Sequence, residues 1–167
     1  MAGMHHQPDG AAFDVVLLLH VGCVVVGLAT TVASAATAAR LRRLIASPAA
    51  LPNAVARYFA PGVNWAGRAM YGIPVFGFAL LAMSQGAYGW RDGWVMGGLG
   101  IFVLVVLVAE SRMWPAERRL QSSLAGPIAG GAAPGPDVLP DARAMSLSAT
   151  MCIVLLTLGS VLMVAQP

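Results

Sequence analysis

One histidine inside a long apolar segment is the residue with the clearest capacity for chemistry. His20 lies about seven residues into the apolar run that starts at Phe13, which is about 10 Å along a helix. An ionisable ring at that depth in a membrane costs free energy unless it contacts protein or water, so His20 is a candidate functional residue. Three interpretations stay open: an axial ligand of haem, part of a His/Met site for haem or Cu(I), or a neutral ring hydrogen-bonded to a hydroxyl or carbonyl of another helix.

Possible co-ligands of His20 are few. No other histidine lies in an apolar run, while Met83 and Met96 lie near the same membrane boundary and Cys23 follows one turn later. Apolar runs contain methionine for packing reasons alone, so this spacing is a weak signal. We therefore favour the hydrogen-bonded ring, expect no cofactor, and keep His20 as the cofactor-binding residue of the alternative.

Two opposite charges lie at a similar depth of two apolar runs. Arg68 is close to the start of the second run, and Glu110 is close to the end of the third. If the two runs are neighbouring antiparallel helices, an ion pair between Arg68 and Glu110 would neutralise both charges and fix the helix register. The alternative is that each side chain extends separately to the headgroups.

Small residues at four-residue spacing form the strongest pattern. They let helix backbones approach closely, and their hydroxyls can bond across the interface. The pattern fits both packing inside the chain and contact with another membrane protein. The predicted packing residues are Gly27, Thr30, Thr31 and Ser34 in the first run and Gly93 and Gly97 in the third.

Composition shows which elements must position these residues. Hydrophobic residues make up 58% of the 167 residues and charged ones only 10%, against roughly 25% charged in an ordinary globular protein. Four segments are long and apolar enough to cross a bilayer. No phosphate loop, metalloprotease motif or nucleophile motif is present in the sequence, so we predict an all-α membrane protein that is not an enzyme.

The four predicted helices lie within four regions of the chain. A tail, 1–12, precedes a three-helix membrane region, 13–120, whose connector, 40–64, holds a short interfacial helix. A stretch rich in Gly, Ala and Pro, 121–143, is predicted to be a disordered linker. The fourth helix follows in 144–167. Pro74 predicts a kink around 70–74 in the second helix.

The ten positive residues are all arginines, and their distribution predicts the orientation. Nine lie in or beside the two connections that follow the first and third helices, and only Arg91 lies on the other side. By the positive-inside rule both termini face outward, and the helices form an antiparallel up-down bundle. Part of this rim is predicted to contact anionic phospholipid: Arg40, Arg42, Arg43, Arg118 and Arg119.

Several short motifs carry a resemblance to known proteins. They are Leu18-Leu19-His20-Val21 with Gly27, the arginine-rich end of the first helix, Tyr88-Gly89-Trp90-x-x-Gly93-Trp94, and Pro115-x-x-Arg118-Arg119-Leu120. Over about 13–120 the chain resembles a family of predicted four-span bacterial membrane proteins of unknown function. Its arginine-only, Ala/Gly/Pro-rich usage resembles proteins of actinobacteria, where similar small proteins accompany the cytochrome bcc–oxidase supercomplex as accessory subunits.

These observations and the resemblance together give an expectation of function. We expect a multi-pass protein of the bacterial plasma membrane that acts as a non-catalytic accessory or assembly subunit, with a respiratory supercomplex as the favoured partner. Its partners would be membrane protein subunits and anionic phospholipids, and not nucleic acid. The alternatives are a haem- or copper-binding redox protein that uses His20 and, as a second alternative, a small transporter or channel.

Overall fold

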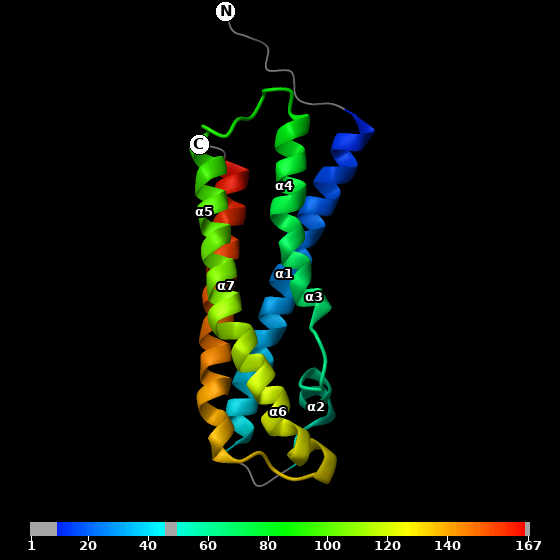
Figure 1. Cartoon of the computed structure of the whole chain (residues 1–167), viewed down its shortest axis with the longest axis vertical. Coiled ribbons are helices and arrows are strands. Elements are labelled where there is room, and N and C mark those ends of the chain that lie inside the picture. Colours follow the sequence, from blue (N-terminus) through cyan, green and yellow to red (C-terminus); the bar gives the residue numbers. More distant parts are fainter. Residues whose placement is uncertain (1–9, 46–49, 166–167) are drawn as a thin grey trace, which may run out of the picture.

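The computed structural model describes residues 10–45 and 50–165. Residues 1–9 of the predicted tail, 46–49 of the connector and the last two residues lie outside the described residues. The described chain forms an antiparallel bundle of long helices (Figure 1). Four helical stretches are long and apolar enough to cross a membrane: Ala11–Leu44, Trp65–Met83, Gly93–Gly130 and Pro136–Ala165. The protein is therefore an all-α, multi-pass membrane protein.

The first span is the single helix α1 (Ala11–Leu44), which has one buried face. Its last turn carries Arg42 and Arg43, which interact favourably with the negative end of the helix dipole. The buried residues recur every three, four or seven positions, as expected for one side of a helix: His20, Gly27, Thr31, Ser34, Ala38 and Leu41.

The second span is interrupted near its start. It consists of α3 (Trp65–Arg68), a 3₁₀ turn (Ala69–Tyr71) and α4 (Gly72–Met83). Pro74 has no N–H to donate to the carbonyl of Met70, and its ring crowds the preceding turn. The irregular turn falls where the kink is predicted. Before it, α2 (Asn53–Tyr58) is the short helix of the connector.

The third span extends beyond residue 120, where the predicted three-helix membrane region ends. The helix α5 (Gly93–Val108) continues through a π turn (Ala109–Met113) into α6 (Trp114–Gly130). Pro115 lies just after the π turn, where an ordinary α-helix would place its ring against the carbonyl four residues earlier. The helix bends away from the bundle axis at this point (Figure 1).

The prediction of a disordered linker over 121–143 is wrong. Residues 121–130 belong to α6, a 3₁₀ turn spans Pro136–Val138, and α7 (Leu139–Ala165) begins directly after it. Leu124 and Val138 are buried in this segment, so it orders itself by packing on its neighbours. Gly131 adopts the left-handed conformation that ends α6, with φ 62°.

The bundle has two ends that differ in packing. We call the end where α1 begins and α7 finishes the terminal end, and the end that holds α2 and the C-terminal part of α6 the connector end (Figure 1). Helix α1 packs on α4 and α7, and α5 packs on α7, but the backbones of α4 and α5 approach each other closely at almost no point. The chain is thus two helix pairs, α1/α4 and α5/α7, joined by the α1–α7 contact.

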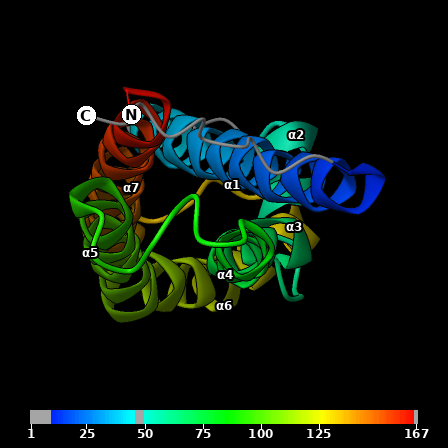
Figure 2. The same ribbon diagram turned by 90° about the horizontal axis from the view of Figure 1, so that it is seen from above.

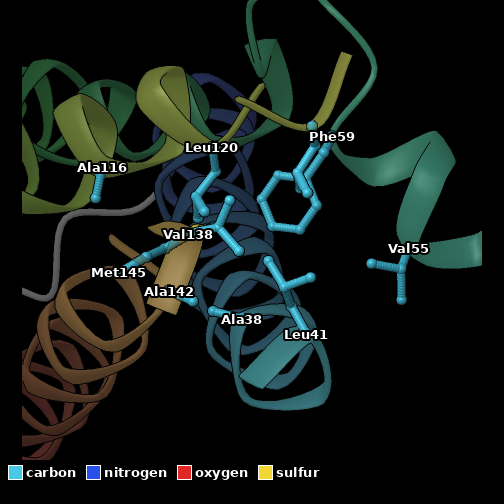
Figure 3. Close-up of a cluster of buried hydrophobic side chains, with 10 residues drawn as sticks. Ala38, Leu41, Val55, Phe59, Ala116, Leu120, Val138, Ala142 and Met145 are labelled. Carbon is cyan, nitrogen blue, oxygen red and sulfur yellow. The ribbon is translucent and has the colours of Figure 1, made fainter. Parts of the chain in front are cut away.

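The connector end is filled by a hydrophobic cluster drawn from four helices, α1, α2, α6 and α7, and a 3₁₀ turn. Phe59, Leu41 and Leu120 are fully buried at its centre (Figure 3). A second cluster occupies the middle of the bundle and includes Met70, Val105 and Cys152. The other members of the connector-end cluster are Ala38, Val55, Ala116, Leu124, Val138, Ala142 and Met145.

Candidate functional site

A cavity occupies the terminal-end half of the bundle, between the two helix pairs. It has a volume of about 560 Å³ and is lined by residues of α1, α4, α5 and α7, which fits the range of about 300–1,000 Å³ for small-molecule sites. Its walls are largely aliphatic and aromatic, with Phe78 of α4 facing Leu99 and Phe102 of α5. The polar groups on it are few, and His20 and Asp14 of α1 are two of them.

His20 is held in a defined orientation at this cavity. Its side chain is 8% exposed, and its Nδ1 lies 2.9 Å from the carbonyl oxygen of Ile73 in α4. A carbonyl can only accept, so Nδ1 carries the hydrogen; when the ring is neutral, Nε2 is then the unprotonated acceptor. This hydrogen bond across a helix interface is one of the three interpretations offered by the sequence.

Two glycines of α4 create the space that α1 occupies. A Cβ at Gly77 would lie 3.3 Å from Cε1 of His20, and one at Gly72 would lie 2.5 Å from Sγ of Cys23. Any larger residue at these positions would push the two helices apart. Sequence reasoning missed both glycines, because residues five positions apart do not repeat on one face of a helix and form no recognisable packing pattern.

The loop between α4 and α5 contributes Tyr88 to the wall of the cavity at the terminal end. Tyr88 packs edge-on against Trp94, with ring centroids 5.5 Å apart. Trp90 similarly packs on Phe78, with ring centroids 5.3 Å apart. The loop crosses from α4 to α5 at the terminal end of the bundle (Figure 2). Aromatic contacts therefore hold this loop beside the site.

The candidate co-ligands of His20 are not brought together. Met96 is 52% exposed on the lipid-facing side of α5, and neither it nor Met83 lines the cavity. Cys23 points at Gly72 in the α1–α4 interface. The methionine that does line the cavity is Met163 of α7. Among the described residues there is no group of three or more His, Cys, Asp or Glu side chains placed to hold a metal ion.

Most of the predicted packing residues of α1 and α5 are used inside the chain. A Cβ added at Gly27 would lie 3.2 Å from Cβ of Met70, and one added at Gly97 would lie 2.8 Å from Cδ2 of Leu162. The hydroxyl of Ser34 lies 2.6 Å from that of Tyr58. The threonine hydroxyls bond within α1: Thr31 donates to the carbonyl of Gly27 at 2.6 Å, and Thr30 donates to the same carbonyl and to that of Val26.

Gly93 differs from the other predicted packing residues because it faces outward. No atom lies within 4 Å of a Cβ added at Gly93, and the same is true of Gly100, two turns further along α5. Three large residues on the same helix are about half exposed: Met96 at 52%, Val103 at 48% and Leu107 at 58%. We call these five residues the α5 outer face.

Arg68 and Glu110 form an ion pair between the second and third spans, with Nη1 of Arg68 3.5 Å from Oε1 of Glu110. The hydroxyl of Tyr71 also donates to Glu110. The guanidinium of Arg68 lies 3.9 Å from the ring centroid of Trp114, a cation–π contact. The cluster therefore ties α3 to the π turn that follows α5.

A buried carboxylate lies nearer the connector end, and no pattern in the sequence pointed to it. Glu117 is 6% exposed in α6 and faces Tyr58 and Asn64. Burial, followed by the neighbouring Glu117 carboxylate, raises the pKa of the Tyr58 hydroxyl. These groups link α1, α2 and α6 where the sequence predicted only a surface connector.

The basic rim lies at the connector end. Arg40, Arg42 and Arg43 are at the end of α1 and are exposed. Arg118 and Arg119 are exposed on α6, and Nε of Arg119 lies 2.8 Å from Oδ1 of Asp141. Arg91, by contrast, lies in the loop at the terminal end.

No protein-family model matches this chain, and no curated protein and no solved structure matches it.

Proposed function

We propose that this chain is a non-catalytic accessory or assembly subunit of a larger plasma-membrane complex, and that it contacts its partner through the α5 outer face. The observation that carries the proposal is the open space at Gly93 and Gly100. Gly27 and Gly97 are already covered from within the chain, so the outward glycines are available to a helix of another protein. Close backbone approach at small residues is how membrane helices associate.

The location of the described residues supports an action inside the membrane. Four membrane-spanning stretches account for most of them, and the connections between these stretches are short. The resemblance to accessory proteins of the cytochrome bcc–oxidase supercomplex favours a respiratory complex as the partner. That choice of partner rests on the resemblance alone.

Photo-crosslinking in native membranes tests the partner contact. A photoreactive amino acid at Val103, on the α5 outer face, is expected to give one discrete adduct with a larger protein. The control position is Val32 of α1, which is exposed to a similar extent, at 46%, and is expected to give lipid adducts only. Equal patterns at the two positions would contradict the proposal.

A pair of matched substitutions separates contact from folding. Gly100→Leu is expected to abolish the Val103 adduct, since its side chain would occupy the approach path. Gly22→Leu is the control, because Gly22 of α1 also has no atom within 4 Å of an added Cβ. Both variants should reach the membrane in normal amounts. Persistence of the adduct in Gly100→Leu would rule out this face.

We also propose that the connector end faces the cytoplasm, where the arginine rim contacts anionic phospholipid. An impermeant maleimide applied to intact cells should label Ala87→Cys, in the terminal-end loop, and spare Ser123→Cys, which is exposed on α6. Labelling of Ser123→Cys alone would reverse the orientation.

A further inference from the structure

The terminal-end cavity is lined by a histidine with a ring nitrogen that has no hydrogen-bond partner among the described residues. Nδ1 of His20 donates to the carbonyl of Ile73, which leaves Nε2 of the neutral ring as an acceptor. Among the described residues, no fully buried side-chain nitrogen or oxygen lacks a hydrogen bond. Nε2 has none, so it is not sealed in protein, and the space it reaches is the cavity that His20 lines. A bound molecule would satisfy it by donating a hydrogen.

The walls of the cavity restrict the ligand to an uncharged, mainly apolar molecule. Leu17, Leu99 and Phe102 offer no partner for a charge, and a charge moved there from water would be strongly penalised. Asp14 at the exposed start of α1 also lines the cavity and would repel an anion. A cation paired with Asp14 would lie six residues, or about 9 Å of helix, from His20 and would leave Nε2 without a donor. The remaining class is an apolar body with a neutral donor group.

The surroundings indicate that this molecule arrives from the bilayer. Tyr88 of the loop between α4 and α5 lines the terminal end of the cavity. Helices α4 and α5 both line the cavity, yet their backbones approach each other closely at almost no point. Leu17 and Phe78, which also line it, are 41% and 42% exposed within membrane-spanning helices, so the cavity is open along the part of the bundle that lies in the bilayer.

We propose that the terminal-end cavity binds an uncharged membrane alcohol, with its hydroxyl donating to Nε2 of His20 and its apolar body between the two helix pairs. The hydroxyl can belong to an aliphatic lipid alcohol or to the phenolic ring of a quinol, since both offer the same donor on an apolar chain. This ligand site is separate from the α5 outer face, so the test of ligand binding does not depend on whether the proposed partner contact exists.

The test is photolabelling of the full chain in phosphatidylcholine nanodiscs by dodecanol that carries a diazirine at its far end. Saturable adducts are expected on the cavity-facing residues of α4 and α5. Unlabelled dodecanol should displace the label, whereas dodecyl methyl ether, which lacks the donor, should not. If dodecyl hydroquinone displaces the label at a lower concentration than dodecanol does, the natural donor is a phenolic hydroxyl. If dodecanol displaces it at the lower concentration, the natural donor is an aliphatic hydroxyl.

Two variants and a matched control connect the label to the site. His20→Leu removes the acceptor and is expected to weaken saturable labelling about fivefold to tenfold, the effect of losing one hydrogen bond. Val95→Phe fills the cavity that Val95 lines and should abolish saturable labelling. Val103→Phe makes the same change on the α5 outer face, where Val103 is 48% exposed, and should leave labelling unchanged.

Three results would overturn the inference. One is equal displacement by the methyl ether, which would show that the cavity merely accepts hydrocarbon chains. Another is unchanged labelling in Val95→Phe. The third is a haem absorption band in the purified protein that disappears in His20→Leu, which would assign Nε2 to a metal instead.

Discussion

The two ends of the bundle differ in how densely their side chains pack. At the connector end, side chains from α1, α2, α6 and α7 converge, and Leu41, Phe59 and Leu120 are completely buried. At the terminal end the two helix pairs separate around a cavity of about 560 Å³, beside a loop held by aromatic contacts. Stability is therefore concentrated at one end, which leaves the other for the proposed ligand.

The difference has a simple origin in residue size. Large aliphatic and aromatic residues fill the connector end. Near the terminal end, Gly72 and Gly77 draw α1 onto α4, while Gly97 and Gly98 admit Leu162 and Met163 of α7 to α5. Each helix pair is tight within itself, and the backbones of α4 and α5 stay apart. The cavity thus follows from close packing inside each pair.

The largest expected effect compares leucine truncation at the two ends. Leu120→Ala should lower the free energy of unfolding by about 2–5 kcal/mol, because it leaves a hole in a fully packed cluster. Leu99→Ala, which lines the cavity, should cost clearly less, since it only enlarges a space that already exists. Equilibrium unfolding in mixed micelles gives both values. Equal losses would remove the distinction between the ends.

The next effect probes the tight α1–α4 contact. Gly72→Ala places a Cβ 2.5 Å from Sγ of Cys23 and is expected to cost about 1–3 kcal/mol of unfolding free energy, as overpacking commonly does. The double variant Cys23→Ala/Gly72→Ala should recover most of that loss. Gly97→Ala should cost less, because it meets only the flexible end of Leu162. A double variant as unstable as Gly72→Ala would show that Cys23 is not the obstacle.

The smallest effect concerns the ion pair between the two regions. The Glu110 side chain is 46% exposed, so Glu110→Gln should change the free energy of unfolding by less than about 1 kcal/mol. Arg68→Ala should cost more, because it also removes the contact with Trp114. Asp141→Asn, which breaks the exposed pair with Arg119, is the control and should change the free energy of unfolding by a similarly small amount. A larger loss in Glu110→Gln than in Arg68→Ala would contradict this ranking.

Hydropathy was sufficient to predict the four helices, because a membrane span must satisfy its backbone within one long apolar helix. The kink near Pro74 was predictable for a similarly local reason. The segment 121–143 was not predicted correctly, because composition outweighed spacing. Leu120 and Leu124 are four residues apart and share a helix face, and that periodicity was the signal of order.

The site was predictable only in part. The depth of His20 identified it as unusual, but no pattern in the sequence showed that Gly77 would shape its surroundings or that Met163 would line the same cavity. Those relations depend on how far the helix pairs diverge, which is a property of tertiary packing. The same holds for Glu117, whose partners Tyr58 and Asn64 come from the connector.

The contrast between the ends is tested most directly by paired spin labels in nanodiscs. One pair, at Ala82 of α4 and Met96 of α5, spans the terminal end, and the other, at Arg43 of α1 and Arg143 of α7, spans the connector end; all four residues are exposed. We predict a broad distance distribution for the first pair that narrows when dodecanol is added, and a narrow one for the second that does not change. Equally narrow distributions, both indifferent to the alcohol, would contradict the account.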